Sequence, residues 1–208
     1  MRAKLGYFIP GAPIALLVAL SLSACAGRVI SGGPPRAQIE DLLLQQDAFP
    51  EGWTASSEGP HAPSGDAPLG GGPAPIETTI LFFHIPVDGG SGGAFEEIFR
   101  FWTERDAADA FIQTESKYFH DDREAWTVPP DLADWRPAAV TWRLGCTDTT
   151  SIPLCQYLGQ YGEYLVGFSI DVSAYSADLR LVDIVTEDQL LALLEKIDGV
   201  MVTVAAER

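Results

Sequence analysis

The chain has 208 residues, of which 47% are hydrophobic and 10% aromatic. This is enough apolar material for one packed domain, and it excludes a chain that is disordered throughout. The formal net charge of −16 at pH 7 gives a surface that repels phosphate backbones, so we do not expect nucleic acid as a partner.

The amino terminus has the three parts of an export signal. Arg2 and Lys4 give it a positive start, and residues 14–20 form a short apolar run. This run is shorter than the roughly 20 residues that a transmembrane helix needs, but it suits the core of a signal peptide. The sequence Leu22-Ser23-Ala24-Cys25 then closes the segment.

This four-residue sequence resembles the lipobox of bacterial lipoproteins. The resemblance implies that the Cys25 thiol carries a lipid, that the chain is cleaved before Cys25, and that the new amino terminus is acylated. We therefore expect a signal peptide over residues 1–24, a lipidated tether over 25–35, and a single extracytoplasmic domain over 36–208. The alternative is an ordinary signal peptide, or an uncleaved anchor, in which the cysteine stands by chance.

The expected domain begins with a helix and a loop. Ile39 and Leu42 belong to a set of apolar residues at helical spacing, which predicts a helix over residues 36–46, and Pro50 bounds this segment. Residues 54–76 contain many Ser, Gly and Pro residues, which are typical of a long irregular loop.

Two apolar runs, at residues 78–86 and 95–102, predict a β-hairpin. The sequence Gly89-Gly90-Ser91-Gly92-Gly93 between them matches the G-x-S-x-G pattern of the nucleophile elbow in serine hydrolases. That elbow requires a strand before it and a helix after it. Here the following segment alternates like a strand, so we interpret the glycines as a hairpin turn and reject the hydrolase motif.

The sequence of the second half of the domain predicts one helix, three strands and a final helix. Helical spacing indicates a helix over residues 104–119, and strand-like runs follow at 139–144, 156–161 and 163–172. Near the carboxyl terminus, Thr186 to Gln189 fits a capping box at the start of a helix with a leucine-rich buried stripe.

This order of elements predicts an α+β fold. Strands that follow one another through short turns favour a single antiparallel β-sheet over a parallel, doubly wound one. We expect the helices to pack mainly on one face of this sheet. The other face would then be open and available to a ligand.

The cysteines left after Cys25 are Cys146 and Cys155. Outside the cytoplasmic membrane the surroundings are oxidising, so this even pair predicts one disulfide, which would close the turn between the third and fourth strands. The alternative is a metal or redox pair, but eight intervening residues do not fit a C-x-x-C motif.

The histidines do not predict a metal site. His120 stands beside Asp121 and Asp122, and His61 and His84 are distant in sequence. One His beside two acids at a helix end is more often a solvated terminus, because the positive charge favours the negative end of the helix dipole. We therefore expect no metal and no cofactor.

The adjacent carboxylates Glu96 and Glu97 do not predict a catalytic pair either, because neighbouring residues of a strand point to opposite faces. Most of the aromatic residues are expected in the core, although several could line a groove for sugars or apolar ligands. Trp135, which lies in a polar run, is the tryptophan that we expect to be exposed.

The layout also resembles the extracytoplasmic sensor-type domains of some bacterial lipoproteins and receptor kinases, in its leading helix, Pro-x-Gly-Trp turn, disulfide and final helix. We expect a non-catalytic, sensor-like domain that binds a small ligand or an envelope protein. A lipid on Cys25 would hold it on the outer side of the cytoplasmic membrane, or in the outer membrane if the host has one. The alternatives are an envelope hydrolase with an unrecognised carboxylate or metal site, and a structural subunit of an envelope complex.

Overall fold

The computed structural model describes residues 38–56, 72–87, 90–119, 126–149, 152–174 and 185–206. All of them belong to one compact unit, Ala37–Arg208. The predictions for the signal peptide, the tether and Cys25 lie outside the described residues, as do those for His61 and for His120 to Asp122.

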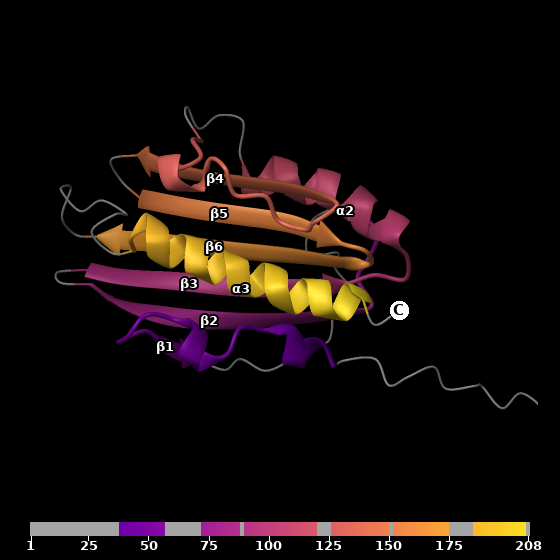
Figure 1. The fold of residues 1–208 in the computed structure, drawn as a ribbon, viewed down its shortest axis with the longest axis horizontal. Helices are drawn as coiled ribbons and strands as arrows, with labels where there is room; N and C mark the ends of the chain where they lie inside the picture. Colours follow the sequence, from indigo (N-terminus) through magenta and orange to yellow (C-terminus); the bar gives the residue numbers. More distant parts are fainter. Residues whose placement is uncertain are drawn as a thin grey trace, which may run out of the picture. The chain divides into compact units, whose positions relative to one another are not determined.

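The fold is built on one antiparallel sheet of six strands, arranged in the order β1-β2-β3-β6-β5-β4 (Figure 1). Two hairpins, β2–β3 and β4–β5, supply four of the strands, and β6 joins the hairpins by pairing with both β3 and β5. The strands are β1 (Thr54–Ser56), β2 (Glu77–Val87), β3 (Gly90–Arg100), β4 (Thr141–Thr149), β5 (Ile152–Tyr161) and β6 (Tyr164–Ala174).

The larger part of the core lies on one face of the sheet, which we call the α3 face. Helix α3 (Glu187–Ala206) packs here with its leucine stripe, against apolar side chains such as Val166 and Ile170 of β6. Three short 3-10 turns lie against the same core, to which the first and third add buried residues and the second adds the partly buried Ala48. They are η1 (Ile39–Leu42), η2 (Gln46–Ala48) and η3 (Pro130–Leu132).

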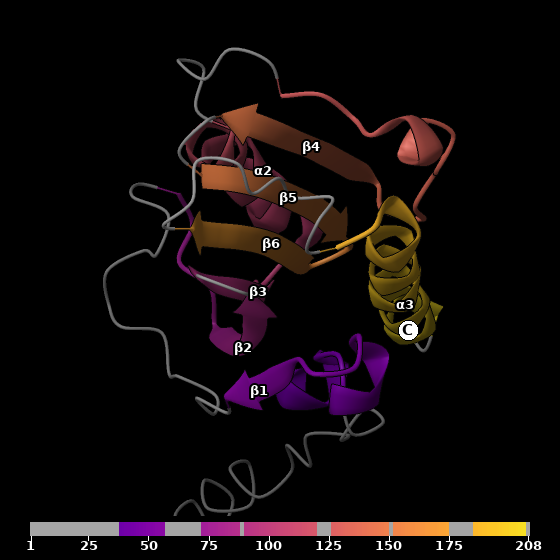
Figure 2. The same cartoon turned by 90° about the vertical axis from the view of Figure 1, so that its left-hand side faces the viewer.

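The opposite face, called the α2 face, carries helix α2 (Glu104–Tyr118) and a second, smaller core. In this core Phe111 of the helix packs with Phe99 of β3 and Leu165 of β6. Phe99 and Leu165 are directly paired, so they share a face. Figure 2 shows α2 and α3 on opposite sides of the sheet.

The predicted α+β class, with a single antiparallel sheet and one disulfide, is confirmed. The helical cover is greater on one face, as expected, but the other face is partly covered by α2. The helix over 104–119 and the hairpin are also found, but the turn predicted over Gly89 to Gly93 is wrong for Gly90 to Gly93, which pair with β2 as part of β3. Because this segment is strand, Ser91 does not occupy a strand–turn–helix elbow.

The helix predicted over residues 36–46 is wrong for the part that the structure describes. Residues from Gln38 onward form the 3-10 turns η1 and η2, with extended backbone at Leu43 between them. The backbone N–H of Leu44 donates to the Glu96 carboxyl at 2.8 Å and so does not join a helical ladder. A tertiary hydrogen bond has therefore overridden a local helical pattern. The predicted loop over 54–76 also begins with a strand, β1.

Helix α3 begins as predicted, with a reciprocal capping box. The N–H of Gln189 donates to Thr186 Oγ1 at 3.2 Å, and the N–H of Thr186 donates to Gln189 Oε1 at 2.9 Å. Of the helices that the structure describes, none is long and apolar enough to cross a membrane.

Candidate functional site

The two adjacent carboxyls of β3 lie on opposite faces of the sheet, as the alternation predicts. Glu96 is 1% exposed on the α3 face, and burial raises its pKa to about 8, against the lowering effect of the hydrogen bond from Leu44. Glu97 lies on the α2 face, where burial raises its pKa to about 8 as well. Both carboxyls are therefore mainly protonated at neutral pH.

Glu97 meets the end of α2 above Gly167, its direct partner on β6. A Cβ atom at position 167 would lie 3.0 Å from Glu97 Oε1 and 2.6 Å from the hydroxyl oxygen of Tyr118. Both oxygens are thus within 3.0 Å of one point above Gly167. The glycine leaves the space in which the side chains from β3 and α2 approach each other.

Two further polar side chains lie next to this point on the same face. Ser169 follows Gly167 by two residues, so it also points to the α2 face, and Gln156 of β5 is its direct partner. Ser169 is 0% exposed. Its hydroxyl, the Gln156 Oε1 atom and the Tyr118 hydroxyl are all buried and have no hydrogen-bond partner among the described residues.

Trp126 extends this group toward the edge strand β4. Its ring packs on Gly145, where a Cβ atom would lie 3.2 Å from Trp126 Cε3, and Gly145 is the direct partner of Gln156. The indole Nε1 is also buried without a partner in the described part of the chain.

We call this set, Glu97, Tyr118, Trp126, Gln156 and Ser169, the α2-face cluster. Buried polar groups in native proteins are nearly always hydrogen-bonded, and each unmade bond costs about 1–3 kcal/mol. Several such atoms on neighbouring residues of one face indicate a place where groups other than the described residues, such as a ligand or water, would form hydrogen bonds. The α2-face cluster is therefore the candidate functional site.

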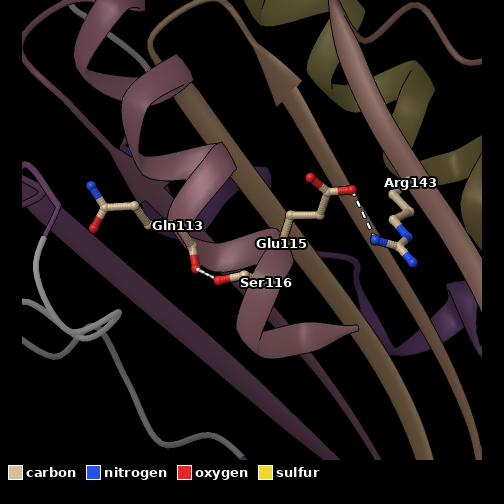
Figure 3. A network of polar contacts seen from close by, with 4 residues as sticks. All are labelled: Gln113, Glu115, Ser116 and Arg143. Atoms are coloured by element: carbon tan, nitrogen blue, oxygen red, sulfur yellow. Dashed lines mark hydrogen bonds and ion pairs between the residues drawn. The ribbon is translucent and has the colours of Figure 1, made fainter. Parts of the chain in front are cut away.

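The positive charge of Arg143, on the neighbouring strand β4, is already paired. Arg143 of β4 forms an ion pair of 2.9 Å with Glu115 of α2, and its guanidinium lies 4.4 Å from the centre of the Phe119 ring. Figure 3 shows Glu115 extending from α2 toward Arg143, whereas Gln113 extends away from it. These contacts hold the end of α2 against β4 and use the charge of Arg143.

Aromatic rings stand at both ends of the row of paired residues that contains Ser169 and Gln156. On one side Phe95 of β3 is the direct partner of Ser169, and Phe82 of β2 is the direct partner of Phe95. Phe82 is 40% exposed, and its ring centre is 6.1 Å from that of Phe95. On the other side stands Trp126, in edge contact with Phe119.

A second candidate is a cavity of about 170 Å³ beside the disulfide. The disulfide joins the directly paired Cys146 and Cys155 across the β4–β5 hairpin, which confirms the predicted pairing. Val185 and Leu190, around the start of α3, also line this cavity. Its lining includes none of the buried unpartnered atoms found in the described residues, so we rank it below the α2-face cluster.

The sequence placed the cysteine pair correctly but missed the site. Trp135, which was expected to be exposed, is partly buried and makes edge contacts with Trp142 and Tyr157, so that prediction is wrong. The exposed tryptophan is Trp102, at 77%.

Within the described ranges, no three His, Cys, Asp or Glu side chains converge as metal ligands. The alternation of polar residues in β6 was the one available signal for Ser169.

No protein-family model, no curated protein and no solved structure matches this chain.

Proposed function

We propose that the chain is a lipid-anchored domain of the bacterial cell envelope that binds a small ligand without transforming it. The α2-face cluster supports the proposal, because it gathers buried polar atoms that have no hydrogen-bond partner among the described residues and that a bound molecule would satisfy. The extracytoplasmic location is supported by the lipobox sequence that ends at Cys25 and by the Cys146–Cys155 disulfide. Disulfides persist in oxidising compartments and are rare in the cytosol.

The anchor compensates for the charge of the domain. With a net charge of −16, the protein is repelled by anionic headgroups, so electrostatic attraction would not hold it at a membrane. Two or three acyl chains, each CH₂ contributing about 0.8 kcal/mol, are sufficient for stable attachment.

The test compares membrane attachment of the native chain and of Cys25→Ser in a bacterial host that processes lipoproteins. We expect the native chain to sediment with membranes, and its amino-terminal peptide to begin at Cys25 with the mass of the acyl groups. Cys25→Ser should lack this mass. The matched control is Cys146→Ser/Cys155→Ser, which should stay attached, because these cysteines form the disulfide. A free thiol at Cys25 in the mature native chain would refute the anchor.

A second candidate function is an envelope hydrolase, and it is favoured by Glu97. A carboxyl whose pKa is about 8 is protonated at neutral pH and can act as a general acid. Glu97→Gln separates the two functions. If the domain only binds, the variant keeps measurable affinity for the ligand and the native chain leaves that ligand unchanged. If the domain is a hydrolase, product appears with the native chain and is lost with the variant.

A further inference from the structure

A ligand of the α2-face cluster must offer both hydrogen-bond donors and hydrogen-bond acceptors. The indole N–H of Trp126 can only donate, and Gln156 Oε1 can only accept. The hydroxyls of Tyr118 and Ser169 can do either. A ligand that satisfies all four atoms must itself carry both kinds of group, as neighbouring hydroxyl or amide groups do.

The surroundings of the cluster favour an uncharged ligand. Glu97 is mainly protonated at neutral pH, and Arg143 is paired with Glu115. Asp171, two residues beyond Ser169 on the same face, is exposed to solvent, although partial burial of its carboxyl raises its pKa. An anionic ligand at the cluster would have no free positive charge supplied by Arg143, and a cation would face a protonated Glu97 with only the exposed Asp171 as a counter-charge. Burying an unpaired charge is costly.

The aromatic rings at the two ends of the row of paired residues provide apolar surfaces for contact with a ligand. Phe82 and Phe95 stand at one end of the row, and Trp126 stands at the other. Aromatic faces bind apolar C–H surfaces, while polar groups between them fix orientation. A sugar ring offers such C–H faces together with a rim of hydroxyl groups.

We propose that the α2-face cluster binds a neutral saccharide, with hydroxyl groups of the sugar bonded to Tyr118, Gln156 and Ser169. This inference rests on the proposed function and names the class of its ligand. Because Ser169 is fully buried, a sugar reaches its hydroxyl group only when a neighbouring group moves. The last turn of α2, which carries Tyr118, is the described element beside the site.

The test uses saturation-transfer difference NMR on the full chain, purified from membranes in a detergent without a sugar headgroup. The neutral probes are N-acetylglucosamine and glucose, and the charged probes are glucosamine and glucuronate. We expect transfer to the neutral sugars and weaker transfer to both charged ones. Gly167→Ala places a methyl group where the Tyr118 and Glu97 oxygens meet, and it should weaken neutral-sugar binding by about tenfold, the loss of one or two hydrogen bonds.

Two further variants separate binding from folding. Gly199→Ala is the matched control, because a Cβ atom there meets no atom within 4 Å, and it should bind sugars as the native chain does. Ser169→Ala removes a buried hydroxyl that has no hydrogen-bond partner among the described residues, so the variant should unfold no more easily than the native chain but bind the sugars more weakly.

Three results would overturn the saccharide proposal. They are no transfer to either neutral probe, equal transfer in the native and Gly167→Ala chains, and stronger transfer to a charged probe than to its neutral counterpart. The first of these would mean that water alone satisfies the cluster. None of them changes the mass of the Cys25 peptide, so failure of this inference is distinguishable from failure of the anchored location.

Discussion

The backbone N–H of Leu44 donates a hydrogen bond of 2.8 Å to Oε2 of Glu96, which lies 52 residues further along the chain. The contact joins the first described segment to β3, the second strand of the β2–β3 hairpin. It also leaves the other carboxyl oxygen, Oε1, buried without a partner in the described part of the chain. A carboxyl in such a position is tolerated most easily in its neutral form.

Glu96 therefore makes stability depend on pH. Its pKa is about 8 in the folded protein and near the ordinary value of 4.5 in an unfolded chain. Between these pH values the folded chain binds more protons than the unfolded chain, so stability is greatest below pH 4.5 and falls as the pH rises through 8. We expect the free energy of unfolding to drop by a few kcal/mol from pH 5 to pH 9. Denaturation with urea at a series of pH values measures this.

Glu96→Gln identifies the source of that slope. The amide keeps an acceptor for Leu44 N–H but does not titrate, so the variant should lose part of the slope and retain the part from Glu97. Glu195→Gln, at an exposed position on α3, is the matched control and should keep the native slope. Identical slopes in Glu96→Gln and the native chain would contradict this account.

The disulfide yields a second prediction. It closes a short ring across one hairpin, and on chain-entropy grounds a ring of this size contributes roughly 2.5–3 kcal/mol. We expect Cys146→Ala/Cys155→Ala to lose about that much free energy of unfolding, with little loss of packing, since alanine is close to cysteine in size. Reduction with dithiothreitol should lower the native denaturation midpoint and leave the double variant unchanged. If reduction left the native midpoint where it was, the disulfide would have no role in stability.

Regular local patterns made much of the fold predictable. The alternation along β6 predicted which side chains share a face of the sheet, and it therefore placed Phe168 and Ser169 on opposite faces. The capping box at Thr186 located the start of α3, because both of its hydrogen bonds are local. Such signals depend only on residues a few positions apart.

What the sequence did not predict depends on distant contacts. The spacing of Ile39 and Leu42 fits a helix, but the N–H of Leu44 has its acceptor on β3. The α2-face cluster depends on where α2 ends, which brings the Tyr118 hydroxyl over Gly167. Neither residue is unusual by itself, and only the packing of α2 across β6 reveals that the Tyr118 hydroxyl is buried without a hydrogen-bond partner among the described residues.

A third prediction concerns the hydrogen bonds that hold α3 to the sheet. Asp198 Oδ1 accepts from Tyr161 Oη at 2.9 Å and from the backbone N–H of Ala138 at 2.8 Å, and the Tyr161 hydroxyl is 2.7 Å from that of Tyr157. Burial raises the pKa of Tyr161 well above its ordinary value, so the phenol remains a donor across the accessible pH range. We expect Asp198→Ala to cost about 1–3 kcal/mol, because it removes the acceptor of two donors.

The control for this network is Asp198→Asn, which keeps an acceptor oxygen and should cost less than Asp198→Ala. A double-mutant cycle with Tyr161→Phe should be non-additive, since both changes remove the same bond. Additive losses in thermal or urea denaturation would show that the two side chains act independently.

The fourth prediction compares two glycines that should respond to alanine with opposite signs. A Cβ atom at Gly159 would overlap the Tyr157 hydroxyl and lie 2.7 Å from Tyr157 Cζ. That ring is fully buried and is held by Tyr161 and by the edge of Trp135, so it has no room to shift. Gly159→Ala should therefore cost about 1–3 kcal/mol, as overpacking does in a close-packed core.

Gly199 has the contrary environment, on the exposed side of α3, where a Cβ atom meets nothing within 4 Å. Gly199→Ala removes backbone freedom from the unfolded chain and adds a good helix former, so it should stabilise by about 0.5–1 kcal/mol. Urea denaturation of both variants at one pH tests the pair, because any general effect of adding a methyl group would move both in the same direction. A loss of stability in both would mean that α3 is constrained at Gly199. No loss in Gly159→Ala would mean that the Tyr157 ring can move, and that the hydrogen bonds from Tyr157 through Tyr161 to Asp198 do not fix it.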